Sequence, residues 1–120
     1  MVALGTRTSA IMGNDEALIE AIKASADEAG ENFWPMPLPS ELRATLDSPV
    51  ADIANIGERW GGMLSAGIFL KEFIEPDQAW AHLDIAGPAF NEGKPYGYTP
   101  VGGTGHAVRT LVRLAETAAR

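Results

Sequence analysis

The stretch that decides the fold is Trp80-Ala81-His82-Leu83-Asp84-Ile85-Ala86, in which apolar and polar side chains alternate. Successive side chains of a β-strand point to opposite faces, so Ala81, Leu83 and Ile85 share one face and the polar residues share the other. We therefore predict a strand over residues 80–86 whose apolar face rests on the core.

Helices are predicted on both sides of this strand. Gly61 to Ile74 is apolar nearly all round, which predicts a helix buried on more than one side. After the strand, residues 87–105 contain six glycines and three prolines and are expected to form a long, structureless loop. A last helix then opens at Thr104 or Gly105. Its apolar stripe is expected to be Val108, Leu111, Val112 and Ala115.

In the first half of the chain, the sequence predicts one helix and several short extended pieces. That helix is capped by Asn14, carries Leu18, Ile22 and Ala26 on one face, and ends at Gly30. The remaining expectations are a buried strand at Val2–Leu4, an extended piece at Ser9–Met12, an extended segment over residues 33–39 with its three prolines, a short helix capped by Ser40, and a strand or extended segment at Val50–Ile56.

This alternation of short apolar runs and helices predicts an α/β fold in one layered domain. The chain has 120 residues, of which 46% are apolar and 21% charged. That length and composition suit a single globular core.

Charge and composition exclude several classes of partner. Sixteen acidic residues against nine basic ones give a formal net charge of −7, and the basic residues are scattered. We therefore expect no nucleic acid and no anionic membrane surface as partner. There is no cysteine, so disulfides and thiolate chemistry are excluded. No export signal is visible at Met1 to Gly5, which makes a cytoplasmic location the expectation.

The residues alone give no complete catalytic constellation. His82 and Asp84 share a strand face and could both meet one metal ion, with Asp52 as a conceivable third ligand. The simpler interpretation is that the pair hydrogen-bonds neighbouring backbone. Gly102-Gly103-Thr104-Gly105 precedes a helix as phosphate-binding loops do, but it lacks the lysine and the directly preceding strand. Arg59 could bind a carboxylate or simply be solvated.

Several segments together resemble one family. They are Trp34-Pro35-Met36-Pro37-Leu38, Ala51-Asp52-Ile53-Ala54-Asn55-Ile56-Gly57, Arg59-Trp60-Gly61-Gly62, Phe69-Leu70-Lys71-Glu72-Phe73, Trp80-Ala81-His82-Leu83-Asp84-Ile85-Ala86-Gly87, and Gly103-Thr104-Gly105 with Val108-Arg109-Thr110-Leu111. In this order and spacing they resemble the C-terminal part of the leucyl aminopeptidase (cytosol aminopeptidase) catalytic domain. The resemblance runs from Val2 to about Leu114, and we take residues 1–120 as that one part.

The resemblance implies a fold, a reaction and partners. The fold is part of a three-layer α/β/α domain with a mixed sheet. The reaction is hydrolytic release of the N-terminal amino acid of a peptide, with two divalent metal ions (Mn or Zn) that activate water. Family members assemble as homo-oligomers, so the resemblance implies one here.

The sequence departs from the family in its metal ligands. The family's Asn-Thr-Asp-Ala-Glu-Gly-Arg motif has no counterpart here, and neither have its catalytic lysine and its bicarbonate-holding arginine, which Arg59 and Arg109 do not match. We therefore expect a fragment without catalytic residues, which binds no metal ion and is inactive alone.

The resemblance leaves three candidate substrate-binding residues: Ile56, Ala86 and Ala89, at positions that line the pocket for the substrate's first side chain. Small apolar walls leave room for a leucine-like side chain. Ala89 stands where family members often carry a larger residue such as Met. Alternatively, Ile56 and Ala86 belong to the plain core. At the level of the whole chain, the alternatives are a non-catalytic binding or scaffolding module, and a hydrolase completed by a separate chain.

Overall fold

A mixed three-stranded sheet, in the order β2-β1-β3, lies at the centre of the fold. The structure, a computed structural model, describes residues 1–119. The central strand β1 (Ser9–Gly13) runs parallel to β2 (Phe33–Pro35) and antiparallel to β3 (Ala81–Asp84). A second, two-stranded sheet pairs β4 (Phe90–Asn91) with β5 (Gly102–Gly103).

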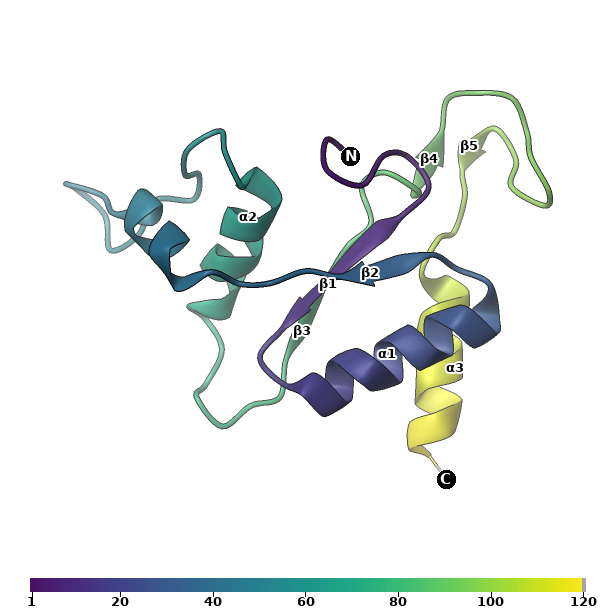
Figure 1. The fold of residues 1–120 in the computed structure, drawn as a ribbon, viewed down its shortest axis with the longest axis horizontal. Coiled ribbons are helices and arrows are strands. Elements are labelled where there is room, and N and C mark those ends of the chain that lie inside the picture. Colours follow the sequence, from purple (N-terminus) through teal and green to yellow (C-terminus); the bar gives the residue numbers. More distant parts are fainter. Residues whose placement is uncertain (120) are drawn as a thin grey trace.

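Helices cover both faces of the central sheet (Figure 1). On one face α1 (Glu16–Ala29) packs against α3 (Val108–Ala118). On the other face α2 (Gly62–Lys71) packs against the 3-10 helix Ser40–Leu46 and against β1. The predicted α/β class, with three layers and a mixed sheet, is confirmed.

The strand β1 is buried on both faces because its neighbours approach from both layers. Ile11 belongs to the core cluster that includes Ile22 and Phe33. Met12 points the other way, since its Sδ would lie 2.9 Å from a Cβ added to Gly67 of α2. The extended piece predicted at Ser9–Met12 is therefore confirmed as the central strand.

The strand predicted at residues 80–86 is confirmed as β3, which is shorter than predicted. In the register, Leu83 pairs with Ile11 and His82 pairs with Met12. Ala81, Leu83 and Ile85 all pack against the core cluster, as the alternation predicted.

The helix predicted after Asn14 is confirmed as α1, but its N-cap is one residue later. Asp15 Oδ1 accepts a hydrogen bond from the Leu18 backbone N–H at 2.7 Å. The Asn14 side chain is occupied elsewhere: its amide donates to Gln78 O at 2.9 Å, and its carbonyl oxygen accepts from Trp80 N at 2.8 Å. At the other end Gly30 has φ 70°, the left-handed conformation that glycine adopts without strain.

The strand predicted at Val2–Leu4 is wrong. These residues form a turn, in which the Gly5 N–H donates to Met1 O at 2.8 Å, and the Val2 side chain is fully exposed. The turn instead lies against Gly87, where an added Cβ would be 2.6 Å from Gly5 O. A three-residue apolar run is buried as a strand only where another strand pairs with it, and none does so within residues 1–119.

Three predictions in the middle of the chain are modified. Residues 50–56 form a series of bends and no strand. The short helix after Pro39 is present as a 3-10 helix without a side-chain cap. The helix predicted over Gly61 to Ile74 is confirmed as α2 but ends at Lys71. Its buried residues Ser65, Gly67 and Ile68 lie on more than one side of the helix, which contacts both the 3-10 helix and the central sheet, so the predicted burial on more than one side is confirmed.

The prediction of a structureless loop over residues 87–105 is wrong. It folds back as a hairpin, because β4 and β5 pair and the Thr104 N–H donates to Ala89 O at 3.0 Å. The Asn91 side-chain amide ties the tip together by donating to the backbone oxygens of Lys94 and Pro100.

The last helix, α3, has the predicted period but presents the other face to the core. Thr110 is fully buried and Leu114 packs against the core cluster. The predicted stripe of Val108, Leu111 and Val112 is exposed, with Leu111 at 49%. Among residues 1–119 no helix has both the length and the apolar character needed to span a membrane.

Candidate functional site

The three predicted substrate-binding residues lie around the end of β3 and in the bent segment before α2. Ala86 follows β3 and is exposed, and Ala89 is half-buried where its N–H donates to Ile85 O at 3.0 Å. Ile56 is 79% exposed. The alternative that Ile56 and Ala86 are plain core residues is therefore wrong for this chain.

A cavity of about 470 Å³ lies beside the end of β3. Ala86 lines it, together with Arg7, Phe90 and Tyr96. Ile56 and Ala89 are not among its lining residues, so the structure of residues 1–119 does not bring all three candidates into one cavity. One side of this cavity is closed by the N-terminal turn, which the contact between Gly87 and Gly5 holds against the end of β3.

The polar face of β3 does not form a metal centre in the described part of the chain. The Asp84 carboxylate accepts from the Ala86 N–H at 3.4 Å, which is the local backbone contact expected for it. His82 stacks on Trp80 with 6.5 Å between ring centroids. No group of three or more His, Asp or Glu side chains within residues 1–119 is placed to hold a metal ion, so Asp52 does not complete a site.

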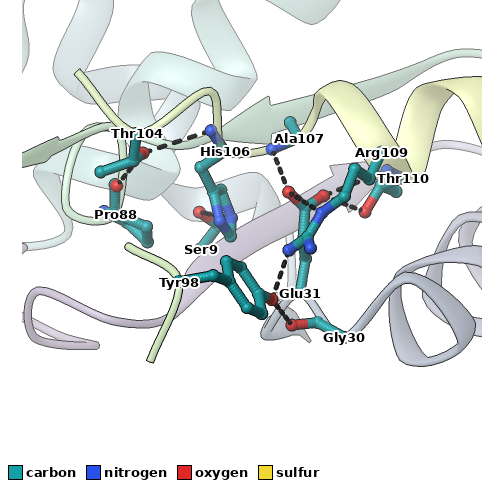
Figure 2. Close-up of polar contacts among 10 residues, drawn as sticks. All are labelled: Ser9, Gly30, Glu31, Pro88, Tyr98, Thr104, His106, Ala107, Arg109 and Thr110. Carbon is teal, nitrogen blue, oxygen red and sulfur yellow. Dashed lines mark hydrogen bonds and ion pairs between the residues drawn. The ribbon is translucent and has the colours of Figure 1, made fainter. Parts of the chain in front are cut away.

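A cluster around Glu31 ties the start of α3 to the end of α1 (Figure 2). Glu31 is 5% exposed, and its carboxylate accepts from the Ala107 N–H at 3.2 Å, the Thr110 N–H at 3.1 Å and the Thr110 hydroxyl at 2.6 Å. A carboxylate at a helix N-terminus satisfies amides that have no partner within the helix and is favoured by the helix dipole. Glu31 is thus the cap of α3, supplied from another part of the chain.

His106 joins the same cluster to the central sheet. Its Nε2 is hydrogen-bonded to the Ser9 hydroxyl at 3.0 Å, and its ring stacks on Phe33 with 4.9 Å between centroids. Burial lowers the pKa of His106 below its usual value of 6.5. The nearby Glu31 carboxylate opposes this shift, and the Arg109 guanidinium adds to it. His106 is therefore held as the neutral imidazole at neutral pH.

Thr104 connects the hairpin to α3. Its hydroxyl donates to Pro88 O at 2.6 Å and accepts from the His106 N–H at 3.2 Å. Gly102 and Gly103 pair with β4, so the glycine-rich stretch forms a strand and a turn. The stretch Gly102 to Gly105, which was considered as a phosphate-binding loop, is therefore part of the hairpin and of the turn that follows it.

Neither Glu31 nor His106 was singled out from the sequence. The partners of Glu31 are 76 and 79 residues away in the chain, so no local pattern could reveal it. Arg59, the other candidate, lies over the Trp60 ring at 5.6 Å, and no carboxylate within residues 1–119 forms an ion pair with it.

Comparison with known proteins decides the family. Residues 1–112 match the family model described as the cytosol aminopeptidase family, catalytic domain. The chain belongs to the cytosol aminopeptidase family. Two relatives, each called a probable cytosol aminopeptidase, come from Streptomyces coelicolor, 66% identical over 99% of this chain, and Nocardia farcinica, 58% identical over 97%.

Solved structures support the same family and the same fold. The bottromycin maturation enzyme BotP in complex with Mn matches with a TM-score of 0.96 and 43% identity, over 99% of this chain and 26% of that chain. A tomato leucine aminopeptidase mutant matches with a TM-score of 0.87 and 33% identity, over 95% and 21%. The recognition of an aminopeptidase family from its sequence motifs is thus confirmed.

The chain spans only part of the cytosol aminopeptidases that it matches. It covers 23% of the length of both the Streptomyces and the Nocardia relatives. The activity, substrates and partners of a complete cytosol aminopeptidase are therefore only proposed for this chain.

Proposed function

We propose that these 120 residues are the C-terminal part of an aminopeptidase catalytic domain and contribute one wall of its substrate pocket. The reaction of the whole enzyme would be hydrolytic release of the N-terminal amino acid of a peptide. The observation that carries the proposal is the match of residues 1–112 to the catalytic domain of the cytosol aminopeptidases.

The wall would consist of Ile56, Ala86 and Ala89. Two features of the structure support this role: the Ala86 side chain faces a cavity, and Ile56 is exposed, so neither is needed to fill the core. An aliphatic side chain transferred from water into an apolar pocket gains about 1.5–3 kcal/mol. A small residue such as Ala89 would leave space for a leucine-like side chain.

The cofactor of the whole enzyme would be two divalent metal ions, Mn or Zn, which would supply an activated water. One solved relative is described as a complex with Mn. The donor groups of residues 1–119 do not fit such a centre, because no three of them converge. We propose that the metal ligands lie outside these 120 residues and that this part binds substrate without holding metal.

The remaining expectations belong to the same proposal. The enzyme would bind the N-terminus of a peptide as its substrate. It would assemble as a homo-oligomer in the cytoplasm, and it would bind neither nucleic acid nor a membrane. The acidic balance of the chain supports the exclusion of phosphate-rich partners.

A chimera tests the proposal. The segment of the Streptomyces coelicolor relative that matches this chain is replaced by these residues, and hydrolysis of leucyl and alanyl anilides is measured. Because the two segments are 66% identical, we expect an active chimera. In it, Ala86→Leu should raise KM for the leucyl substrate about tenfold or more and affect the alanyl substrate less.

Ala24→Leu serves as the matched control, since Ala24 is an exposed residue of α1. It should change neither KM. A chimera that folds, judged by circular dichroism, but has no activity would overturn the proposal. So would equal effects of Ala86→Leu and Ala24→Leu.

A further inference from the structure

A second cavity, of about 260 Å³, lies between the N-terminal segment, the end of α1, the hairpin and the start of α3. Its charged lining residues are Arg7, Glu31 and Arg109. It shares Arg7, Pro88 and Tyr96 with the cavity beside Ala86. The proposed function gives this second cavity no role.

Arg7 presents an unneutralised cation to the cavity. Its guanidinium carbon lies 3.8 Å from the centroid of the Tyr96 ring. Among residues 1–119 no carboxylate is within ion-pairing distance of Arg7. Stacking on the ring fixes the guanidinium plane and leaves its N–H donors available, so little freedom is lost when they bind an anion.

Arg109 is the second cation, and it is held in a similar way. Its guanidinium carbon lies 4.3 Å from the Tyr98 centroid and its side chain is 47% exposed. It also donates a hydrogen bond to the Tyr98 hydroxyl, which in turn donates to Gly30 O at 3.3 Å. This chain of contacts fixes the guanidinium at the wall of the cavity (Figure 2).

Glu31, the acidic residue of the cavity wall, does not neutralise the positive charge of both arginines. Its carboxylate side chain is 4% exposed and accepts three hydrogen bonds from the start of α3. Arg109 Nε lies 3.7 Å from Glu31 Oε1, which is a longer contact than these. The charge that a solute meets in the cavity is therefore positive, although the whole chain carries −7.

We propose that this cavity binds a small organic anion through its carboxylate or phosphate group, with Arg7 and Arg109 as the recognising side chains. The planar fork of a guanidinium matches both groups with paired hydrogen bonds. The cavity volume limits the ligand to a small metabolite, and the acidic remainder of the chain disfavours a long polyanion. This inference does not depend on the proposed function.

The test uses the 120-residue chain at low ionic strength, where surface charge is least screened. Succinate and inorganic phosphate are titrated separately while the arginine Nε–Hε signals are followed by NMR. We expect saturable shifts at Arg7 and Arg109 with a Kd of about 1 mM or below for at least one of the two anions. Saturation by succinate alone identifies a carboxylate ligand, and saturation by phosphate alone identifies a phosphate ligand.

Arg7→Ala should weaken that binding about tenfold or more, because it removes a charge-assisted pair of hydrogen bonds. The matched control is Arg59→Ala, which removes another guanidinium stacked on an aromatic ring but outside the cavity. It should leave the Kd unchanged. Arg7→Lys keeps the charge without the planar fork and should bind with intermediate affinity.

Three results would overturn the proposal. They are the absence of saturable shifts for both anions, equal weakening in the Arg7 and Arg59 variants, and shifts that map to arginines outside the cavity. If Arg7→Ala loses the dispersed spectrum of a folded chain, the decision rests on Arg7→Lys and on the wild-type shift map.

Discussion

The Thr110 hydroxyl donates a 2.6 Å hydrogen bond to Glu31 Oε2, and both residues are buried. This contact joins two residues that are 79 positions apart in the chain. It fixes the start of α3 against the end of α1, and Thr110 lies on the face of α3 that is turned toward the core.

Removing the Glu31 carboxylate should destabilise the fold strongly. Glu31→Ala leaves two backbone N–H groups and one hydroxyl without an acceptor in a buried place, so we expect a loss of about 2–4 kcal/mol of unfolding free energy. Urea denaturation followed by circular dichroism measures it. The exposed Glu28, which pairs with Arg113, is the control, and Glu28→Ala should cost about 1 kcal/mol or less. Equal losses in the two variants would contradict the capping role.

The free energy of unfolding should decrease as the pH falls, because His106 becomes protonated. Burial lowers the pKa of its folded form, so the folded state favours the neutral ring and the unfolded chain takes up the proton first. The contribution is fully present above the usual pKa of 6.5 and is lost as the pH falls through the folded value. Urea midpoints between about pH 7.5 and pH 5 should therefore decline less in His106→Gln than in the wild type. A decline in His106→Gln that equals or exceeds that of the wild type would refute the assignment.

A methyl group added at Gly13 should disrupt the pairing of β1 with β3. An added Cβ would lie 2.7 Å from the Trp80 backbone oxygen, which has no room to move away without shifting the strand. We expect Gly13→Ala to cost about 1–3 kcal/mol. Gly62→Ala is the control, because nothing lies within 4 Å of its added Cβ and the residue is helical. It should be neutral or stabilising by up to about 1 kcal/mol. Thermal melts of both variants distinguish the two effects, and a neutral Gly13→Ala would mean that the two strands separate easily.

The isolated 120 residues should not hydrolyse leucine amide or leucyl anilides, even with manganese, zinc or cobalt ions supplied. Two-metal hydrolysis needs two held ions, and no three candidate ligands converge within residues 1–119. Release of the anilide product is the measurement. Turnover that survives rigorous repurification and disappears on addition of a chelator would show that the chain forms a metal centre by itself.

Self-association is expected through exposed apolar side chains. Val108, Leu111 and Val112 form an uncovered stripe along α3, and contiguous apolar surface favours contact with a partner. Sedimentation velocity over a wide concentration range should show association that Leu111→Glu weakens. Thr117→Glu, at another exposed position of α3, should leave it unchanged. A single monomeric species at every concentration would argue for an autonomous module.

The sequence by itself determined the local elements and the family. The alternation of residues 81–85, the four-residue spacing of Leu18, Ile22 and Ala26, and Gly30 at a left-handed position each specify structure through neighbours only a few residues away. Such short-range patterns can be read without the fold. The order and spacing of the motifs identified the cytosol aminopeptidase family in the same way.

Only the tertiary structure decided which faces and which polar groups are buried. The period of α3 was predicted, but the face turned toward the core is the one that carries Thr110 in contact with Glu31, and the apolar stripe faces outward. Val2–Leu4 is apolar but has no partner strand within residues 1–119, and it forms a turn. Burial and hydrogen-bond satisfaction depend on contacts between distant parts of the chain, which a local pattern does not contain.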